Sequence, residues 1–159
     1  MSRAFVKEPD GDSAIDELPD RPISPNRNLI TPWGHARIQA ILAEWRRQEA
    51  ATPADDRAAQ ARIGRELRYW QARVASAEVT PPPARPEEVR FGCRVTLARA
   101  DGSRQTLGLV GEDETRPEEG LIAWTAPLAQ ALIGLEEGET VPFGDAELEI
   151  LAIEPLEAA

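Results

Sequence analysis

Residues 95–110 are Val95-Thr96-Leu97-Ala98-Arg99-Ala100-Asp101-Gly102-Ser103-Arg104-Gln105-Thr106-Leu107-Gly108-Leu109-Val110. Val95 and Leu97 alternate with polar neighbours, which is the period-two pattern of a half-buried strand. Asp101-Gly102 is a dipeptide typical of tight hairpin turns, and residues 106–110 then return as a second strand. The segment therefore predicts a β-hairpin.

The sequence around this hairpin predicts a small α+β domain over residues 89–155. Residues 121–124 form a further apolar run, and Pro127 opens a short helix that ends at Gly134. Residues 146–153 alternate as a last strand. On that strand the residues expected to face the core are Leu148, Ile150 and Ala152. Together these elements predict a small antiparallel sheet over one short helix.

Residues 29–79 predict a pair of helices. Thr31-Pro32 and Thr52-Pro53 both match a helix N-cap followed by proline at the first helical position. Apolar residues then recur at steps of three and four. If the chain reverses near Ala54, facing positions in an antiparallel pair should sum to a constant. Four pairs sum to 108: Trp45 with Ile63, Ile41 with Leu67, Ile38 with Trp70, and Gly34 with Val74. We therefore predict an antiparallel coiled-coil hairpin, with two helices of a globular bundle as the alternative.

Two further segments differ in composition from these domains. Residues 1–28 are rich in proline and acidic residues, which predicts a flexible acidic N-terminal arm. In the alternative interpretation Phe5 and Ile15 dock on the body or on a partner. Residues 80–88 contain four prolines and predict a stiff linker between the hairpin and the C-terminal domain.

Charge and cysteine content limit the classes of function. The chain of 159 residues has 28 acidic and 18 basic residues, and residues 84–159 alone carry sixteen acids and six bases. That half is not suited to binding a phosphate backbone and is better suited to a basic protein surface. Cys93 is the only cysteine, so no internal disulfide is possible. No signal-like or membrane-spanning apolar run is present, and we expect a cytoplasmic protein without a membrane partner.

Three segments of the C-terminal half resemble the C-terminal domain of the bacterial Gre transcript-cleavage factors. They are Val89-Arg90-Phe91-Gly92, Val110-Gly111-Glu112-Asp113-Glu114, and Pro127-Leu128-Ala129-Gln130-Ala131-Leu132-Ile133-Gly134. Residues 28–34 and 68–79 are similar to the two helices of the family's N-terminal hairpin. The resemblance covers residues 28–154 and leaves residues 1–27 outside the usual family pattern.

The resemblance implies a fold, a partner and a mechanism. It implies an FKBP-like C-terminal domain that docks on the rim of the secondary channel of bacterial RNA polymerase. The coiled coil then enters the channel and carries acidic residues to the active site of the polymerase. There they help to hold a second Mg²⁺ ion for hydrolysis of backtracked RNA. No intrinsic cofactor is implied, contact with nucleic acid is indirect, and the factor is expected to be a monomer.

The resemblance assigns the candidate catalytic and metal-binding residues to the turn between the helices. Asp55 and Asp56 are the candidates, and Asp56 matches the aspartate of the family pattern. Ala59 stands where the family has Glu, and Gln60 where it has Asn. Adjacent helical residues do not share a face, so Asp55 is a poor replacement for that Glu. Capping of the second helix, with Thr52 as N-cap and Asp55 at the third helical position, is the alternative role for both aspartates.

Two loops are the candidate polymerase-docking residues. The resemblance places the docking face at Glu112, Asp113, Glu114, Trp124, Thr125, Ala126 and Pro127. A Ser usually precedes the proline, and Ala126 replaces it here. An ordinary surface loop is the alternative for residues 112–114. Seven arginines between residues 46 and 73 make the hairpin basic, as a solvated face or as a contact with channel walls or nucleic acid.

The sequence predicts a polymerase-binding elongation regulator with weak or no stimulation of cleavage, which is an accessory factor and not itself an enzyme. The missing Glu and a hairpin two to three turns shorter than the family pattern, about 10–15 Å less reach, favour this reading. A competent cleavage factor using Asp56 and Asp55 is the first alternative. A prolyl isomerase or chaperone, which would need an aromatic pocket, and an adaptor without polymerase contact are the rivals from other classes.

Overall fold

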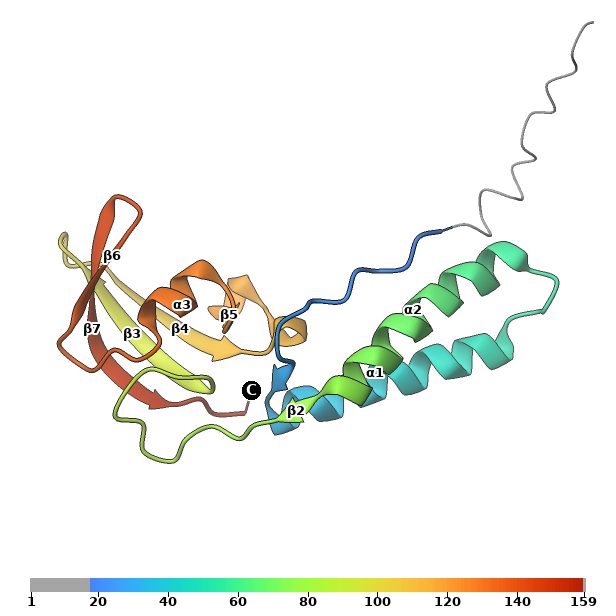
Figure 1. Ribbon diagram of the computed structural model, residues 1–159, viewed down its shortest axis with the longest axis horizontal. Helices are drawn as coiled ribbons and strands as arrows, with labels where there is room; N and C mark the ends of the chain where they lie inside the picture. The colour runs from blue at the N-terminus through green and yellow to red at the C-terminus, as the bar shows by residue number, and fades with distance from the viewer. Residues whose placement is uncertain (1–17, 159) are drawn as a thin grey trace, which may run out of the picture. The chain divides into compact units, whose positions relative to one another are not determined.

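The computed structural model describes residues 18–158, and these residues divide into two compact units. We call residues 18–24 and 39–75 the helical unit, and residues 25–38 and 76–158 the sheet unit. Most of two long helices lies in the first, and a sheet with a short helix lies in the second. Figure 1 shows that this sheet is curved. The α+β class predicted from the sequence is confirmed.

Helix α1 (Pro32–Ala51) begins where the sequence predicts. The Oγ1 atom of Thr31 accepts a hydrogen bond from the backbone N–H of Gly34 at 3.0 Å, which is the N-cap geometry. Pro32 then lies at the first helical position, where its missing N–H costs no hydrogen bond. Helix α1 starts in the sheet unit and continues into the helical unit.

The helical unit is held by apolar contacts between α1 and α2 (Arg57–Ser76). Both helices have 20 residues, so each is about 30 Å long. The buried residues of this core are Leu42, Ile63 and Leu67, and partly buried Trp45, Trp70 and Val74 pack against them. Five of these six belong to the apolar pattern that predicted the helix pair.

Two positions of the predicted α1 pattern face differently in the structure. Leu42 is buried in the helical core, whereas Ile41 is only half-buried. From Ile38 to Trp45, spacings of four and then three residues pass through Leu42, and spacings of three and then four pass through Ile41. Both keep to one face of a helix, so contact with the partner helix decides which of the two residues is buried. Gly34, expected to face Val74, faces Glu114 of the sheet unit: a Cβ atom on Gly34 would lie 1.9 Å from its Oε1 atom.

The sheet unit contains a five-stranded sheet with strand order β5-β4-β3-β7-β6. Its strands are β3 (Cys93–Arg99), β4 (Arg104–Val110), β5 (Leu121–Ala123), β6 (Thr140–Phe143) and β7 (Ala146–Pro155). The predicted hairpin is confirmed as β3 and β4, with Val95 paired to Leu107. The predicted short helix is α3 (Pro127–Leu132).

The sheet is mixed, so the prediction of an antiparallel sheet is wrong at one edge. Strand β5 pairs with β4 in parallel, with Gly108 opposite Leu121. The connection explains this difference: it contains two 3₁₀ turns, η1 (Glu112–Glu114) and η2 (Pro117–Glu119), which carry the chain back before β5 begins. A tight hairpin would have forced the antiparallel direction, whereas a parallel pair needs a longer crossover.

The core of the sheet unit lies between the sheet and α3. Alternate residues of β3 and β7 enter it, together with Ala129 and Leu132 of α3. On β7 the buried residues are Leu148, Ile150 and Ile153, so the expectation for Ala152 is wrong. A register shift opposite Thr96 and Leu97 inserts one residue into β7 and moves the alternation on by one. The sequence gives no sign of such a bulge.

Residues 18–30 and 76–88 connect these elements. Strand β1 (Leu29–Ile30) pairs in parallel with β2 (Glu78–Val79), two short strands within the sheet unit that the sequence did not indicate. Of the predicted arm, residues 1–17 lie outside the described residues, and residues 18–24 contact α2 in the helical unit. Among the helices of the described part of the chain, none is both long and apolar enough for a membrane span.

Candidate functional site

The connection between α1 and α2, residues 52–56, is the first candidate site. We call it the turn. Thr52 closes α1: its backbone N–H donates to the carbonyl of Glu49 at 3.3 Å, and its hydroxyl donates to the carbonyl of Gln48 at 2.6 Å. The prediction that Thr52-Pro53 starts the second helix is therefore wrong. Proline soon after a helix end is as common as proline at a helix start, so the dipeptide fits both positions.

Asp56 is the true N-cap of α2. Its Oδ1 atom accepts the backbone N–H of Ala59 at 3.1 Å, and its carbonyl accepts the N–H of Gln60 at 2.9 Å. Asp55 precedes the cap within the turn, and its carbonyl accepts the N–H of Arg57 at 3.0 Å. Both aspartates are exposed. One candidate carboxylate therefore caps a helix, while the other has no such structural role.

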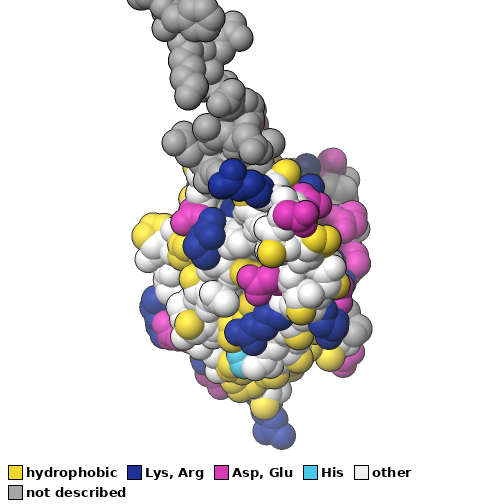
Figure 2. All heavy atoms as spheres, turned by 90° about the vertical axis from the view of Figure 1, so that its right-hand side faces the viewer, with side chains coloured by type: hydrophobic (Ala, Val, Ile, Leu, Met, Phe, Trp, Pro, Cys, Tyr) yellow, Lys and Arg dark blue, Asp and Glu magenta, His cyan; other side chains and the backbone are white. Residues whose placement is uncertain are grey.

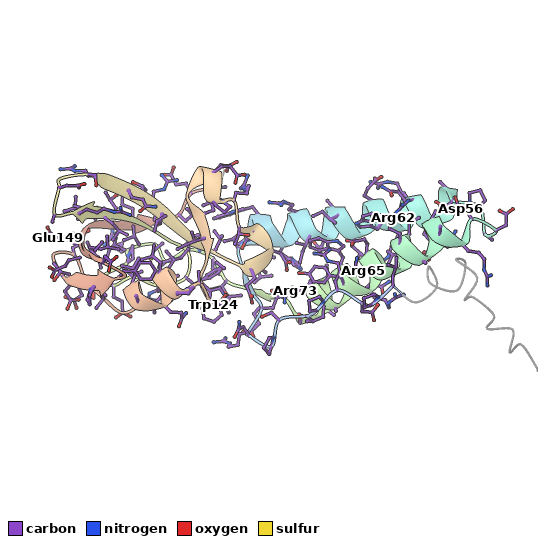
Figure 3. All side chains as sticks on the ribbon, turned by 90° about the horizontal axis from the view of Figure 1, so that it is seen from above. Asp56, Arg62, Arg65, Arg73, Trp124 and Glu149 are labelled. Atoms are coloured by element: carbon purple, nitrogen blue, oxygen red, sulfur yellow. The ribbon has the colours of Figure 1, made fainter. Side chains whose placement is uncertain are left out.

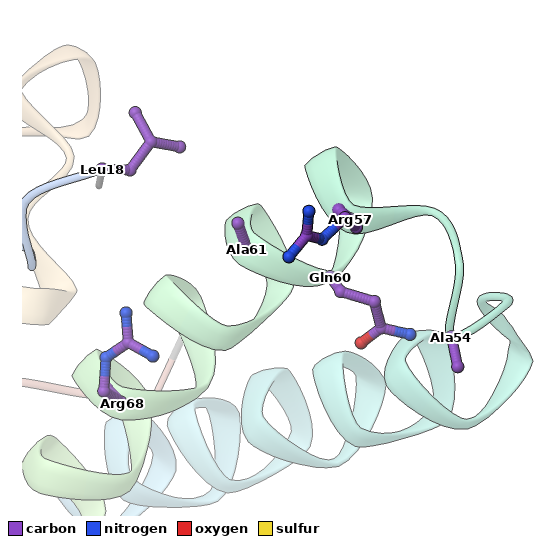
Figure 4. A pocket seen from close by; sticks show the side chains of 6 residues that line it. All are labelled: Leu18, Ala54, Arg57, Gln60, Ala61 and Arg68. Atoms are coloured by element: carbon purple, nitrogen blue, oxygen red, sulfur yellow. The ribbon is translucent and has the colours of Figure 1, made fainter. Parts of the chain in front are cut away.

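Gln60 fastens the turn to α2. Its Nε2 atom donates to the carbonyl of Thr52 at 2.9 Å, and lies 3.4 Å from the carbonyl of Pro53. Figure 4 shows this side chain reaching across to the turn. Gln60 also lines an open cavity of about 330 Å³. The residues lining that cavity are Leu18, Ala54, Arg57, Gln60, Ala61 and Arg68. The turn is thus held by side-chain contacts and carries polar and basic groups on one side.

The turn alone offers too few ligands for a resident metal ion. Within residues 18–158 no group of three or more His, Cys, Asp or Glu side chains could hold a metal. Figure 3 places Asp56 at the end of the helical unit where α1 and α2 are joined, beyond Arg62 and Arg65 of α2. Asp55 and Asp56 can therefore complete a metal site only if other ligands come from a partner.

Several arginines of the helical unit form ion pairs with acids of the same unit. Arg47 binds Glu44, and its hydrogen bond lowers the pKa of that carboxyl, with further help from Gln48. Arg68 binds Asp20 at 2.6 Å, and Arg73 is buried at 1% exposure. Figure 2, which looks onto the end carrying the turn, shows acidic and basic side chains interspersed. The helical unit therefore presents a mixed surface rather than a single basic patch.

Glu114, a candidate docking residue, is an internal contact. Its side chain is 4% exposed and accepts the backbone N–H of Thr31 at 3.1 Å and that of Gly111 at 2.8 Å. The hydroxyl of Thr31 also donates to it. Glu114 therefore holds the start of α1 against the η1 loop, within the sheet unit. The separation of 83 positions between Thr31 and Glu114 hides this pair from any local sequence pattern.

The remaining candidate docking residues lie around β5 and the start of α3. Turn η1, which includes Glu112 and Asp113, packs against β5, and Trp124 follows β5 directly. The backbone N–H of Trp124 donates to Val110 at 2.8 Å, and its carbonyl accepts the side chain of Gln130 at 2.7 Å.

All of these side chains are half-buried apart from Pro127, which is exposed, and Ala126 precedes α3 without a side-chain cap. The structure therefore brings residues 112–113 and 124–127 to one region of the sheet unit.

Comparisons with known proteins place the chain in a family. Residues 84–155 match the family model described as "Transcription elongation factor, GreA/GreB, C-term". GreA of Alkalilimnicola ehrlichii is 32% identical over 132 residues, which are 79% of this chain and 80% of that protein. The chain belongs to the GreA/GreB family. The resemblance inferred from residues 28–154 is thereby confirmed.

Other Gre proteins match over shorter segments. GreB of Neisseria meningitidis is 40% identical over 98 residues, which are 58% of this chain and 60% of that protein. The chain thus spans about three-fifths of the length of that Gre relative. A solved GreA/GreB structure from Nitrosomonas europaea has 21% sequence identity and a TM-score of 0.40, and covers 79% of this chain and 98% of that one.

Proposed function

We propose that this Gre-family chain is an accessory factor that binds bacterial RNA polymerase at its secondary channel and regulates elongation. The FKBP-like sheet unit would dock on the channel rim, and the coiled-coil hairpin of the helical unit would enter the channel. The factor would stimulate transcript cleavage weakly or not at all. Family membership supports the partner and the process, and the turn supports the weak activity.

The turn is the observation that carries this proposal. Stimulated hydrolysis by two metal ions requires the factor to lend carboxylate ligands to the second ion. In this chain Asp56 binds the Ala59 N–H as a helix cap, and Ala59 replaces the Glu of the family pattern. Only Asp55 remains as a second acid, on an adjacent residue. The set of ligands is therefore smaller than the mechanism needs.

Helix length and charge agree with the same proposal. Helices of about 30 Å give the turn a limited reach into a channel. The acidic residues of the C-terminal half are suited to a basic protein surface, since complementary charge steers association. Contact with nucleic acid would then be indirect, through the transcription complex, and the factor would act as a monomer.

A competent cleavage factor is the second candidate. Asp55 and Asp56 are both exposed at the turn, and an N-cap carboxylate has a second oxygen atom with which to approach a metal ion. In this case the Mg²⁺ of the polymerase would be shared transiently by both aspartates. No intrinsic cofactor is needed by either candidate.

A prolyl isomerase is less well supported. Two cavities of the sheet unit, of about 150 and 320 Å³, are lined by charged and small residues. Their lining residues are Ala98, Arg99, Ala100, Asp101, Thr140, Asp145, Ala146, Glu147 and Glu149. A proline-binding pocket would need apolar and aromatic walls, which these cavities lack.

Transcript cleavage in backtracked polymerase complexes tests the proposal. The full chain is compared with the variant Asp55→Asn/Asp56→Asn, because asparagine caps a helix as well as aspartate does and so preserves the turn. Asp145→Asn, an exposed aspartate of the sheet unit, is the matched control. We expect no more than slight shortening of the RNA, together with competition against a cleavage-active Gre factor for the polymerase.

The outcomes separate the candidates. Strong shortening that is lost in the double variant and kept in the control would refute the weak-activity proposal and support the competent factor. Failure to compete with a cleavage-active Gre factor and failure to retain polymerase in a pull-down would refute polymerase binding, and would favour the adaptor.

A further inference from the structure

Residues 18–24 lie along α2 and contact it through side chains of opposite charge. Arg21 binds Glu66 with an Nη1–Oε2 distance of 2.7 Å, and Asp20 binds Arg68 at 2.6 Å. Leu18 lines the cavity that Arg57, Ala61 and Arg68 share on the same helix. The segment therefore binds α2 through two successive residues, Asp20 and Arg21, within the helical unit. We call residues 18–24 the strap.

The side chains around Arg21 form a binding site that fits a guanidinium group. Its Cζ atom lies 3.7 Å from the centroid of the Tyr69 ring and 5.5 Å from that of Trp70. The two rings are nearly perpendicular, with centroids 5.0 Å apart. A guanidinium group is planar, stacks on aromatic faces and binds a carboxylate at the same time, which a lysine ammonium cannot do equally well. Glu66, Tyr69 and Trp70 supply both kinds of contact.

The exposure of these groups distinguishes the site from an ordinary surface ion pair. The side chains of Arg21 and Glu66 are 32% and 20% exposed. The ion pair of Arg27 with Glu78 in the sheet unit has exposures of 68% and 45%, and the described part of the chain provides no ring contact for that arginine. Screening by water is therefore weaker at Arg21, and desolvation strengthens the cation–π contact.

We propose that Glu66, Tyr69 and Trp70 form a guanidinium-binding site on α2 that takes an arginine of a partner protein, and that Arg21 fills this site in the free protein. The strap and the partner compete for one site. Arg68, which binds Asp20, lies next to this site. A partner segment that fits is therefore extended and carries an acidic residue followed by arginine. This inference goes beyond the proposed function and does not depend on it.

Competition with the strap sets the affinity that a partner needs for this site. A strap tethered a few tens of residues away in the sequence presents its arginine at an effective concentration in the millimolar range. A free peptide must reach roughly that concentration to replace it, and the loss of Arg21 removes the competitor. Weak ligands therefore do not bind the site in the intact chain, and the site becomes accessible when the strap dissociates from α2.

NMR spectroscopy of the full chain tests the site directly. The indole N–H signal of Trp70 and the ring signals of Tyr69 are followed in Arg21→Ala, with Arg27→Ala as the matched control. We expect both sets of signals to shift in Arg21→Ala and to stay unchanged in Arg27→Ala. Arg21→Lys should lie between the wild type and Arg21→Ala, because lysine keeps the charge and loses the planar stacking.

A peptide added in trans tests the partner chemistry. The probe has the sequence of residues 18–24 with blocked ends, and a second peptide has alanine at the arginine position. At about 10 mM, above the effective concentration of the strap, the first peptide should move the shifted signals of Arg21→Ala more than halfway back to their wild-type positions. The alanine peptide should have no effect, and Arg21→Ala/Glu66→Gln should respond to neither peptide.

Two results would overturn the proposal. Equal spectra for Arg21→Ala and Arg27→Ala would mean that Arg21 does not occupy the site. If the signals shift in Arg21→Ala and the arginine peptide does not move them back, the site binds only the arginine of its own chain. A far-ultraviolet circular dichroism spectrum that is unchanged in every variant, and that reports chiefly on α1 and α2, shows that the helical unit is intact, so that neither result reflects unfolding.

Discussion

Replacing Glu114 should weaken the sheet unit by far more than an acidic side chain on a loop would suggest. Its carboxyl group is 4% exposed and accepts the backbone N–H groups of Thr31 and Gly111 and the hydroxyl of Thr31. Each buried donor left without an acceptor costs about 1–3 kcal/mol. Glu114→Ala strands the two backbone donors, so we expect a loss of roughly 2–5 kcal/mol.

Glu114→Gln should cost less, because the amide keeps one acceptor oxygen and nearly the same shape. We expect about 1–3 kcal/mol, because the two backbone donors share one oxygen atom, which the amide can keep, while its N–H₂ group meets the hydroxyl of Thr31. Urea denaturation followed by circular dichroism measures both variants. Glu118→Gln, an exposed acid in the neighbouring η2 turn, is the matched control and should change the free energy of unfolding by less than about 0.5 kcal/mol.

Thr31→Val completes a double-mutant cycle with Glu114→Gln. Because the two side chains form one hydrogen-bonded network, the double variant should lose less than the sum of the single losses, with a coupling of about 1 kcal/mol or more. Additive losses, or a change in Glu114→Ala no larger than that in Glu118→Gln, would refute the argument that this carboxyl group holds the start of α1.

Three further predictions concern the turn, the helical core and the thiol. Asp56→Ala should cost about 1 kcal/mol through loss of the α2 cap, whereas Asp55→Ala should change urea stability by a few tenths at most. Leu42→Ala should cost about 2–5 kcal/mol and Ile41→Ala clearly less, by the same assay, because only Leu42 is buried in the core. Burial raises the pKa of the Cys93 thiol above its ordinary value, so stability from this group should be complete below pH 9.0 and be lost as pH rises through the higher folded pKa. A disulfide reagent should therefore react with Cys93 far more slowly in buffer than in urea, and equal rates would contradict its burial.

Most elements of the fold were predictable because their signals are local. The β3–β4 hairpin follows from alternation around Asp101-Gly102, and the starts of α1 and α3 follow from a proline at the first helical position. The start of α2 was missed because Thr52-Pro53 matches a helix start and a helix end equally well. The turn itself was located, but only the structure separates the roles of Asp55 and Asp56.

The contacts that the sequence did not indicate join residues far apart in the chain. Glu114 and Thr31, β5 and β4, and Arg21 and the rings on α2 each meet because the fold brings two surfaces together. No spacing rule links such positions, since each member alone has the ordinary composition of a loop or a helix face.

The amino-acid pattern was thus enough to specify the α+β class, the Gre family and most of the secondary structure, because periodicity and end signals act within a few residues. Tertiary packing settled the choice of Leu42 over Ile41, the direction of β5, the burial of Glu114 and the site of Arg21. Each of these depends on the surface opposite, and that surface exists only after the chain has folded.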